Sequence, residues 1–140
     1  MKVTSDFKMV IVLDQGLPVG LLSNTAAVLS LTLGNKIEGL IDKELTDGSG
    51  TIHAGLTNQP LPILKANTDS LKLLYKKALM LKDNLLLVDI TDAAQTTKNY
   101  IDYEIKLKNK TSEELKILGL ALAGSNKSVK SLTGNLSLLR

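Results

Sequence analysis

The stretch from Phe7 to Gly34 constrains the fold most, because it contains a strand, a glycine-rich turn and a helix in direct succession. Its first part is the apolar run Met9–Leu13, which is rich in β-branched residues, as are strands buried on both faces. Two glycines and a proline interrupt the chain over Asp14–Gly20. Apolar residues then recur every three or four positions over Leu21–Leu33, which predicts a helix. This succession predicts an α/β domain with ligand sites at the carboxyl ends of its strands.

The remaining chain continues to alternate strands and helices, and its 140 residues fit a single domain over 1–140. Apolar runs predict further strands over Leu61–Ala66, Leu85–Ile90 and Lys116–Ala123. Helical spacing of apolar residues predicts helices over Leu71–Leu81, from Asp92 to about Leu107, and over Ser125–Leu132. The helix from Asp92 is expected to face the core through Ala93, Thr97, Tyr100, Ile101 and Ile105.

Turn and cap residues mark the ends of several elements. The sequence Asp47-Gly48-Ser49-Gly50 predicts a turn that joins Lys43–Thr46 to Thr51–Ala54 as a short hairpin. Gly34-Asn35 is expected to end the first helix, because glycine readily takes the left-handed conformation of helix ends. Asn67–Ser70 supplies cap residues for the helix that follows it.

The composition limits the chemistry of the chain. There is no cysteine and only one histidine, so neither a disulfide framework nor a metal site of thiolates or several imidazoles is expected. The turn Asp14–Gly20 has neither the dinucleotide nor the Walker spacing, and no cofactor is predicted. The lack of cysteine fits the reducing cytoplasm, where we expect the protein.

The charge of the chain indicates whether nucleic acid or a membrane is an expected partner. The net charge of +3, from 17 basic and 14 acidic residues, is small for a nucleic-acid binder, and nucleic acid is a weakly supported partner. The densest lysine cluster, Lys106–Lys116, contains two glutamates and fits a solvated helix face. The uncharged segment between Asp14 and Lys36 contains glycine, proline and asparagine, which argues against a membrane span. The apolar run before Asp14 is too short for a signal peptide.

Four polar residues are candidates for a functional site: Asn24, His53, Asp92 and Thr96. Asn24 can donate a hydrogen bond to a ligand or face solvent. His53 can act as a general acid or base, or lie on the surface. Asp92 follows a buried strand, where it can bind a ligand or cap a helix, and Thr96 lies one turn further on the same side. We expect His53 to lie within reach of Asp92 or Asn24.

Three motifs resemble those of type II peptidyl-tRNA hydrolases. Asn24-Thr25-Ala26-Ala27 is similar to their Lys-x-Ala-Ala, and Asp92–Thr96 is similar to their Asp-Ala-Gly-x-Thr. The segment Gly119–Arg140 resembles their closing strand and helix, with the ending Val-x-x-x-Thr-Gly-x-Leu. The whole chain also resembles an uncharacterised bacterial family that carries His-x-Gly near its middle and ends in Leu-Thr-Gly-x-Leu-x-Leu-Leu-Arg.

The resemblance implies a three-layer α/β/α sandwich on a four-stranded mixed sheet, the peptidyl-tRNA hydrolase II-like fold, in a commonly dimeric protein. The leucine-rich tail Leu136–Leu139 independently predicts a homodimer. The chain departs from the hydrolase motifs at three positions, with Asn24 for lysine, Val28 for glutamine and Glu104 for threonine. Since the lysine charge serves a polyanionic substrate, we expect no hydrolysis of peptidyl-tRNA unless folding supplies Lys65 or Lys98 instead.

Two classes of function therefore remain. The chain is either a binding protein for a small ligand or partner, or a hydrolase of an ester or amide, peptidyl-tRNA included, with a site near Asn24 and Asp92. A hydrolase should bring the candidate residues together in a polar pocket. A binding protein should show an apolar groove or a large subunit interface.

Overall fold

The structure is a computed structural model that describes residues 1–140. Its centre is a four-stranded sheet in the order β4-β1-β6-β5. The strands are β1 (Phe7–Asp14), β4 (Ile63–Ala66), β5 (Leu85–Thr91) and β6 (Ile117–Ser125). β1 pairs parallel with β4 and antiparallel with β6, and β5 pairs antiparallel with β6. The sheet is therefore mixed, as predicted, and β1, β4 and β5 end at the same edge.

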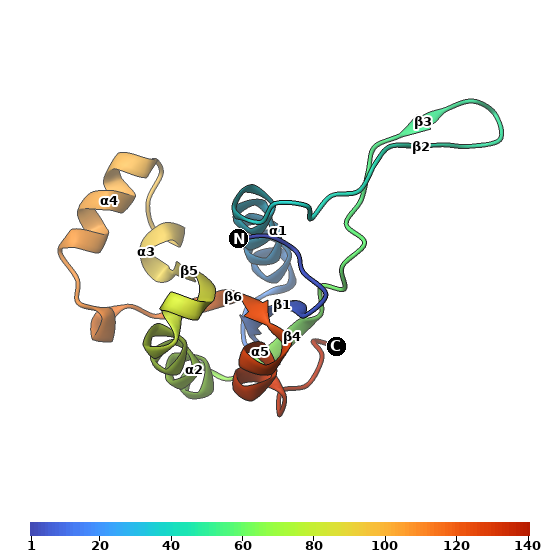
Figure 1. The fold of residues 1–140 in the computed structure, drawn as a ribbon. Helices are drawn as coiled ribbons and strands as arrows, with labels where there is room; N and C mark the ends of the chain where they lie inside the picture. The colour runs from blue at the N-terminus through green and yellow to red at the C-terminus, as the bar shows by residue number, and fades with distance from the viewer.

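Helices cover both faces of this sheet (Figure 1). Helix α1 (Val19–Lys36) packs on one face, and α2 (Thr68–Met80) and α5 (Asn126–Thr133) pack on the other. Alternate residues of β1 supply the two cores, with Ile11 on the α1 side and Val12 on the side of α2 and α5. The strands β1 and β6 are buried along almost their whole length, as their apolar runs predicted.

Helix α1 ends later than its sequence suggested. Gly34 lies inside the helix without a positive φ, and the Ile37 N–H still donates to the carbonyl of Leu33. The prediction that Gly34-Asn35 ends the helix is therefore wrong. Ile37 is itself buried in the core against Leu33, so packing extends the helix past the glycine.

The ends of α2 and of the chain follow from local hydrogen bonds. The Asn67 side chain accepts from the Ser70 N–H at 2.8 Å, which confirms the predicted cap of α2. The C-terminal tail lies along β4, where the Leu139 N–H donates to Ile63 and the Lys65 N–H donates to Ser137. Leu136 and Leu139 pack against the two cores, so most of the leucine-rich tail is absorbed within the chain.

The long helix predicted from Asp92 is two helices. After η1 (Lys82–Asn84) and β5, the chain forms α3 (Asp92–Gln95), α4 (Tyr100–Lys108) and η2 (Ser112–Glu114). The break occurs because Asn99 caps a new helix by accepting from the Asp102 N–H at 2.8 Å. The predicted inner stripe is wrong beyond Thr97, since Tyr100 is 81% and Ile101 is 70% exposed.

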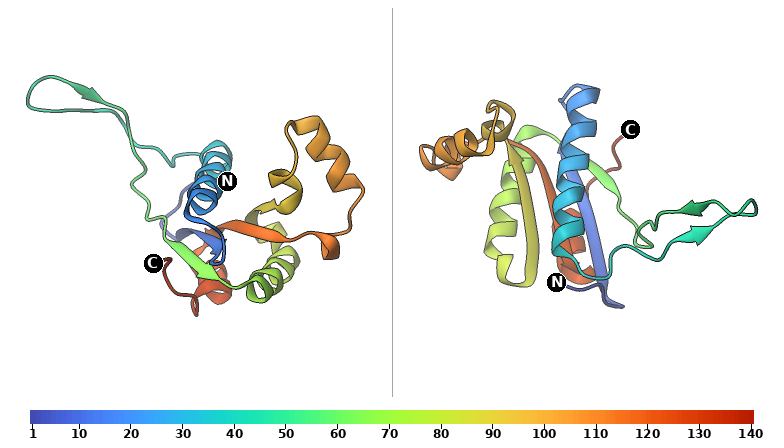
Figure 2. Two further views of the ribbon diagram at one scale, coloured as in Figure 1. Left: turned by 180° about the vertical axis from the view of Figure 1, so that it is seen from behind. Right: turned by 90° about the horizontal axis from the view of Figure 1, so that it is seen from above.

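The predicted hairpin is confirmed, as β2 (Leu45–Thr46) paired with β3 (Ile52–His53). It extends from the body on the side opposite to α3 and α4 (Figure 2). The Asp47 carboxylate closes the turn by accepting from the Ser49 and Thr51 N–H groups, and Gly50 takes φ +87°. None of the helices in the structure has the length and hydropathy that a membrane span requires.

Candidate functional site

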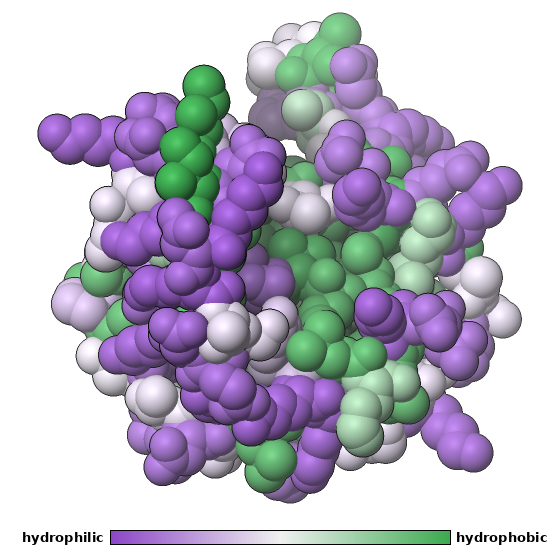
Figure 3. Space-filling view, turned by 90° about the vertical axis from the view of Figure 1, so that its left-hand side faces the viewer, coloured by the Kyte–Doolittle hydropathy of each residue, from purple (hydrophilic) through white to green (hydrophobic).

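A cavity of about 490 Å³ lies between α1, the outer strand β5 and the α3–α4 arm, the segment 92–108. Seen from the side of α4, the surface shows an apolar hollow bordered by polar side chains (Figure 3). The wall and floor are largely apolar and come from Val28, Leu29, Val88, Ile90 and Ala94. The polar lining comes from Asn24, Thr32, Asp89, Gln95, Thr97, Lys98, Asn99, Tyr100 and Tyr103.

Asn24 is the one predicted candidate that lines this cavity. It lies one helical turn before Val28 on the exposed side of α1, and its amide makes no side-chain hydrogen bond within the protein. That this amide donates to a ligand stays a prediction. Lys98, which the sequence offered as a replacement cation, lines the same cavity from the α3–α4 connection.

Asp89 is a site residue that sequence reasoning missed. It lies on β5 opposite Leu120 of β6, and strand alternation places its side chain on the face of β5 that carries Leu85 and Leu87 toward α2. Asp89 is half-buried, with no hydrogen bond or ion pair to another side chain. Burial raises the pKa of the Asp89 carboxyl above its ordinary value. The signal was present in the sequence, since Asp89 is the only charged residue in the apolar run Leu85–Ile90.

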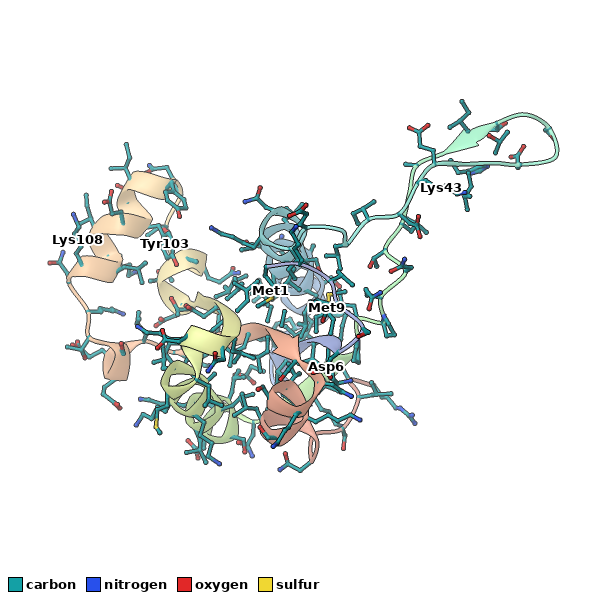
Figure 4. The ribbon with its side chains drawn as sticks, in the orientation of Figure 1. Met1, Asp6, Met9, Lys43, Tyr103 and Lys108 are labelled. Atoms are coloured by element: carbon teal, nitrogen blue, oxygen red, sulfur yellow. The ribbon has the colours of Figure 1, made fainter.

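Tyrosines from two elements lie close to Asp89. Burial raises the pKa of Tyr103 on α4 and of Tyr75 on α2, and in both cases the negative charge of Asp89 is the next cause. Tyr100 and Tyr103 pack edge to face, with ring centroids 5.6 Å apart. Tyr103 lies on the side of α4 that faces α3, whereas Lys108 points away (Figure 4). The negative charge of Asp89 therefore acts on tyrosines of two elements, α2 and α4.

Asp92 and Thr96 lie together, as predicted, but outside the cavity lining. The Thr96 hydroxyl donates to the Asp92 carbonyl at 2.8 Å and accepts from the Lys106 ammonium. One carboxylate oxygen of Asp92 accepts from the Lys116 N–H at 3.1 Å, and the other lies 3.8 Å from the Lys110 ammonium. Thr91, not Asp92, caps α3. Through these contacts Asp92 links α3 to the start of β6.

His53 lies on the β2–β3 hairpin, away from the other candidates (Figure 1). Its Nε2 is 2.8 Å from the Asp47 carboxylate, and its side chain is 60% exposed. The hydrogen bond with His53 lowers the pKa of Asp47, as do the Ser49 and Thr51 N–H groups. The expectation that His53 reaches Asp92 or Asn24 is wrong, because the turn carries the hairpin outward from the sheet.

The turn after β1 carries a buried carboxylate of its own. Asp14 accepts from the Gly16 N–H at 2.9 Å and from the Thr68 hydroxyl at 3.2 Å. These bonds hold the turn between β1 and α1 against the start of α2. Asp14 is therefore engaged within the protein, and the candidate site lies at β5 instead of β1.

These observations describe a mixed α/β domain with a ligand-sized cavity beside its outer strand β5. The chain belongs to the family described as "Protein of unknown function (DUF2000)", whose model matches residues 7–140. A solved structure of a protein of unknown function from Agrobacterium tumefaciens is similar at a TM-score of 0.86 and 19% sequence identity, over 96% of this chain and 98% of that one. At this identity the likeness shows the fold. A comparison with curated proteins found no match.

Proposed function

We propose that this chain is a cytoplasmic binding protein on the peptidyl-tRNA hydrolase II-like fold, which takes a small ligand in the cavity between α1 and the α3–α4 arm. The observation that carries the proposal is the lining of this cavity. Its apolar floor can bury the body of a ligand, and its amides and hydroxyls can orient it. In binding sites a few polar groups around an apolar surface supply the specificity.

The same lining favours binding over hydrolysis. A hydrolytic site needs a nucleophile or bound water held by a base, within hydrogen-bond reach of the substrate. The four candidates do not converge, because His53 is on the hairpin and Asp92 and Thr96 bond to each other and to lysines. Asp89 is the only carboxylate in the lining, and it has no histidine beside it.

The charge of the cavity also argues against peptidyl-tRNA as a substrate. Binding such a polyanion requires several cations that neutralise phosphates, and Lys98 is the only cation in the lining. Asn24 adds a hydrogen-bond donor but no charge. The hydrolase alternative therefore depends on Lys98 taking the place of the lysine that Asn24 replaces.

The test is a peptidyl-tRNA cleavage assay run beside a genuine type II enzyme. We expect turnover at least about 10²-fold below that enzyme, since losing one electrostatic contact to the transition state typically costs this much. The Asn24→Lys and Lys98→Ala variants are measured in parallel. Wild-type turnover comparable to the genuine enzyme, lost in Lys98→Ala, would establish the hydrolase instead.

We also propose that the protein is a homodimer whose interface is the β2–β3 hairpin and not the tail Leu136–Leu139. The tail is absorbed by the chain's own core, but the hairpin exposes Leu45, Ile52 and Leu56, the last of them 79%. An isolated two-stranded hairpin is marginal in water. Packing against a second copy would bury these side chains and stabilise the hairpin.

A further inference from the structure

Two segments project from the body of the protein and have no buried residue of their own (Figure 1). Both strands of the β2–β3 hairpin are exposed, and none of the nine residues of α4 is buried. Each segment still carries large apolar side chains. Ile52 of the hairpin is 65% exposed, and Ile101 and Ile105 of α4 are 70% and 53% exposed. Apolar side chains gathered in this way mark interaction surfaces, so each segment lacks a partner that the single chain does not supply.

The apolar residues of each segment share one face. Ile101 and Ile105 are four residues apart, so they are neighbours on the surface of α4. Ile52 pairs with Thr46 across the hairpin, which places these two side chains on the same face. The hairpin face and one turn of α4 are therefore surfaces of similar extent, and contact between them would remove both from water.

The charges of the two segments are complementary. Over 42–53 the hairpin has three acidic residues and one lysine. Over 98–108 the α3–α4 arm has three lysines and two acidic residues, and Lys98 and Lys106 form no ion pair within the chain. Opposite charge favours a contact between the hairpin of one copy and the arm of another, whereas two hairpins facing each other would bring like charges together.

The placement of the two segments lets both contacts form in one dimer. The hairpin and the arm extend on opposite sides of α1 (Figure 2), so a two-fold axis that passes over α1 brings each hairpin to the arm of the other copy. Resting on the homodimer proposed above, we propose that the hairpin of a second copy docks on α4, with Ile52 against Ile101 and Ile105. Since Tyr100 and Tyr103 of α4 line the cavity, the partner's hairpin then supports one wall of the ligand site.

The first test uses the absence of cysteine from the chain, because a spin label can then be attached at a single site, Ser49→Cys in the hairpin turn. Spin-labelled protein is mixed with isotope-labelled protein that carries no spin label, and NMR records which signals of the latter are broadened. We expect broadening at Ile101 and Ile105 of α4 and none at Leu73 of α2, which covers the other face of the sheet. Broadening confined to the hairpin, or a dimer without broadening on α4, would overturn the proposal.

The second test compares two variants by light scattering at micromolar concentration. Ile105→Asp should shift the protein to monomer, because it places a charge in the buried contact. Leu73→Asp has the same wild-type exposure of 53% and should leave the dimer intact. A dimeric Ile105→Asp variant would contradict docking on α4 while leaving the homodimer standing, whereas a monomeric wild-type protein would contradict both. Thermal unfolding shows that Ile105→Asp stays folded, and neither test depends on a ligand, so the function of the cavity is tested separately.

Discussion

At the scale of single residues, the chain satisfies its polar side chains within the protein at Asp14 and Asp92 but not at Asp89. Asp14 and Asp92 each accept a backbone N–H, and a second group from the protein lies beside each carboxylate. Asp89 has neither kind of contact. Polar side chains that lower stability because they lack a compensating contact are frequent at functional sites. The contrast therefore marks Asp89, which sequence reasoning passed over, as the residue to test.

Replacing Asp89 by asparagine should make the protein more stable at neutral pH. Burial raises the pKa of Asp89 in the folded state above the ordinary value of 3.8, so the folded state favours the protonated carboxyl. The stability linked to this proton is complete below the unfolded pKa and is lost as the pH rises through the raised folded pKa. The Asp89→Asn variant has no carboxyl group to ionise at this position, so it does not lose this stability as the pH rises.

The measurement is the free energy of unfolding in urea from pH 7 down to about pH 4, the ordinary range of an aspartate. The stability difference between Asp89→Asn and wild type should shrink as the pH falls. Carboxyls with lowered pKa, such as Glu113 beside Lys76 and Lys72, act alike in both proteins and cancel in this comparison. A difference that is independent of pH, or a less stable variant at pH 7, would contradict the role given to Asp89.

At the scale of elements, the sequence predicted the sheet well and the arm poorly. The apolar runs of β1 and β6 predict buried strands, and packing on both faces of the sheet buries both. The run Leu85–Ile90 is also a strand, but it is the outer one, and most of its residues are only partly buried. The helix from Asp92 was predicted from spacing alone. Its apolar residues face solvent after Thr97, because the Asn99 cap and the threonines before it favour a break that periodicity does not register.

The close packing of α1 on β6 gives a prediction for Gly119. A Cβ at this position would lie 2.7 Å from the Thr25 side chain and 2.9 Å from that of Leu13. Gly119→Ala should lower the free energy of unfolding by about 1–3 kcal/mol, the usual cost of overpacking a core. Gly34 lies in α1, and a Cβ at this position would have no neighbouring atom of the rest of the protein within 4 Å. Gly34→Ala should therefore raise the free energy of unfolding by up to about 1 kcal/mol. Urea unfolding measures both, and equal effects would contradict the packing described.

At the scale of the whole molecule, the candidate site shows the limits of a single sequence. The sequence placed Asn24 and the strand ends near a ligand site, but the cavity is assembled from α1, β5 and an arm that begins more than fifty residues after the end of α1. Only folding brings Asn24 beside Lys98 and Tyr103. The sequence predicted His53 within reach of Asp92 or Asn24, but His53 lies on a hairpin that extends away from the body of the protein.

The exposed hairpin gives a prediction for the assembly. Light scattering at micromolar concentration should give twice the chain mass of 15.1 kDa. Ile52→Asp should shift the protein to monomer, because a charge in a buried interface is costly. Leu31→Asp, an equally exposed position on α1, should leave the dimer intact. A monomeric wild-type protein would end the proposal, and a dimer that survives Ile52→Asp would move its interface elsewhere.

The central claim, that the cavity between α1 and the α3–α4 arm is the ligand site, is tested most directly by an NMR fragment screen on three proteins. The library holds neutral, anionic and cationic fragments, and the proteins are wild type, Val28→Trp and Leu31→Trp. Val28 lines the cavity and Leu31, on the same helix, does not. We predict fragment-induced shifts at Asn24, Val88 and Tyr103 in wild type and Leu31→Trp, and their loss in Val28→Trp. Shifts confined to the hairpin or to Asp92 and Thr96, or unchanged binding in Val28→Trp, would contradict the claim.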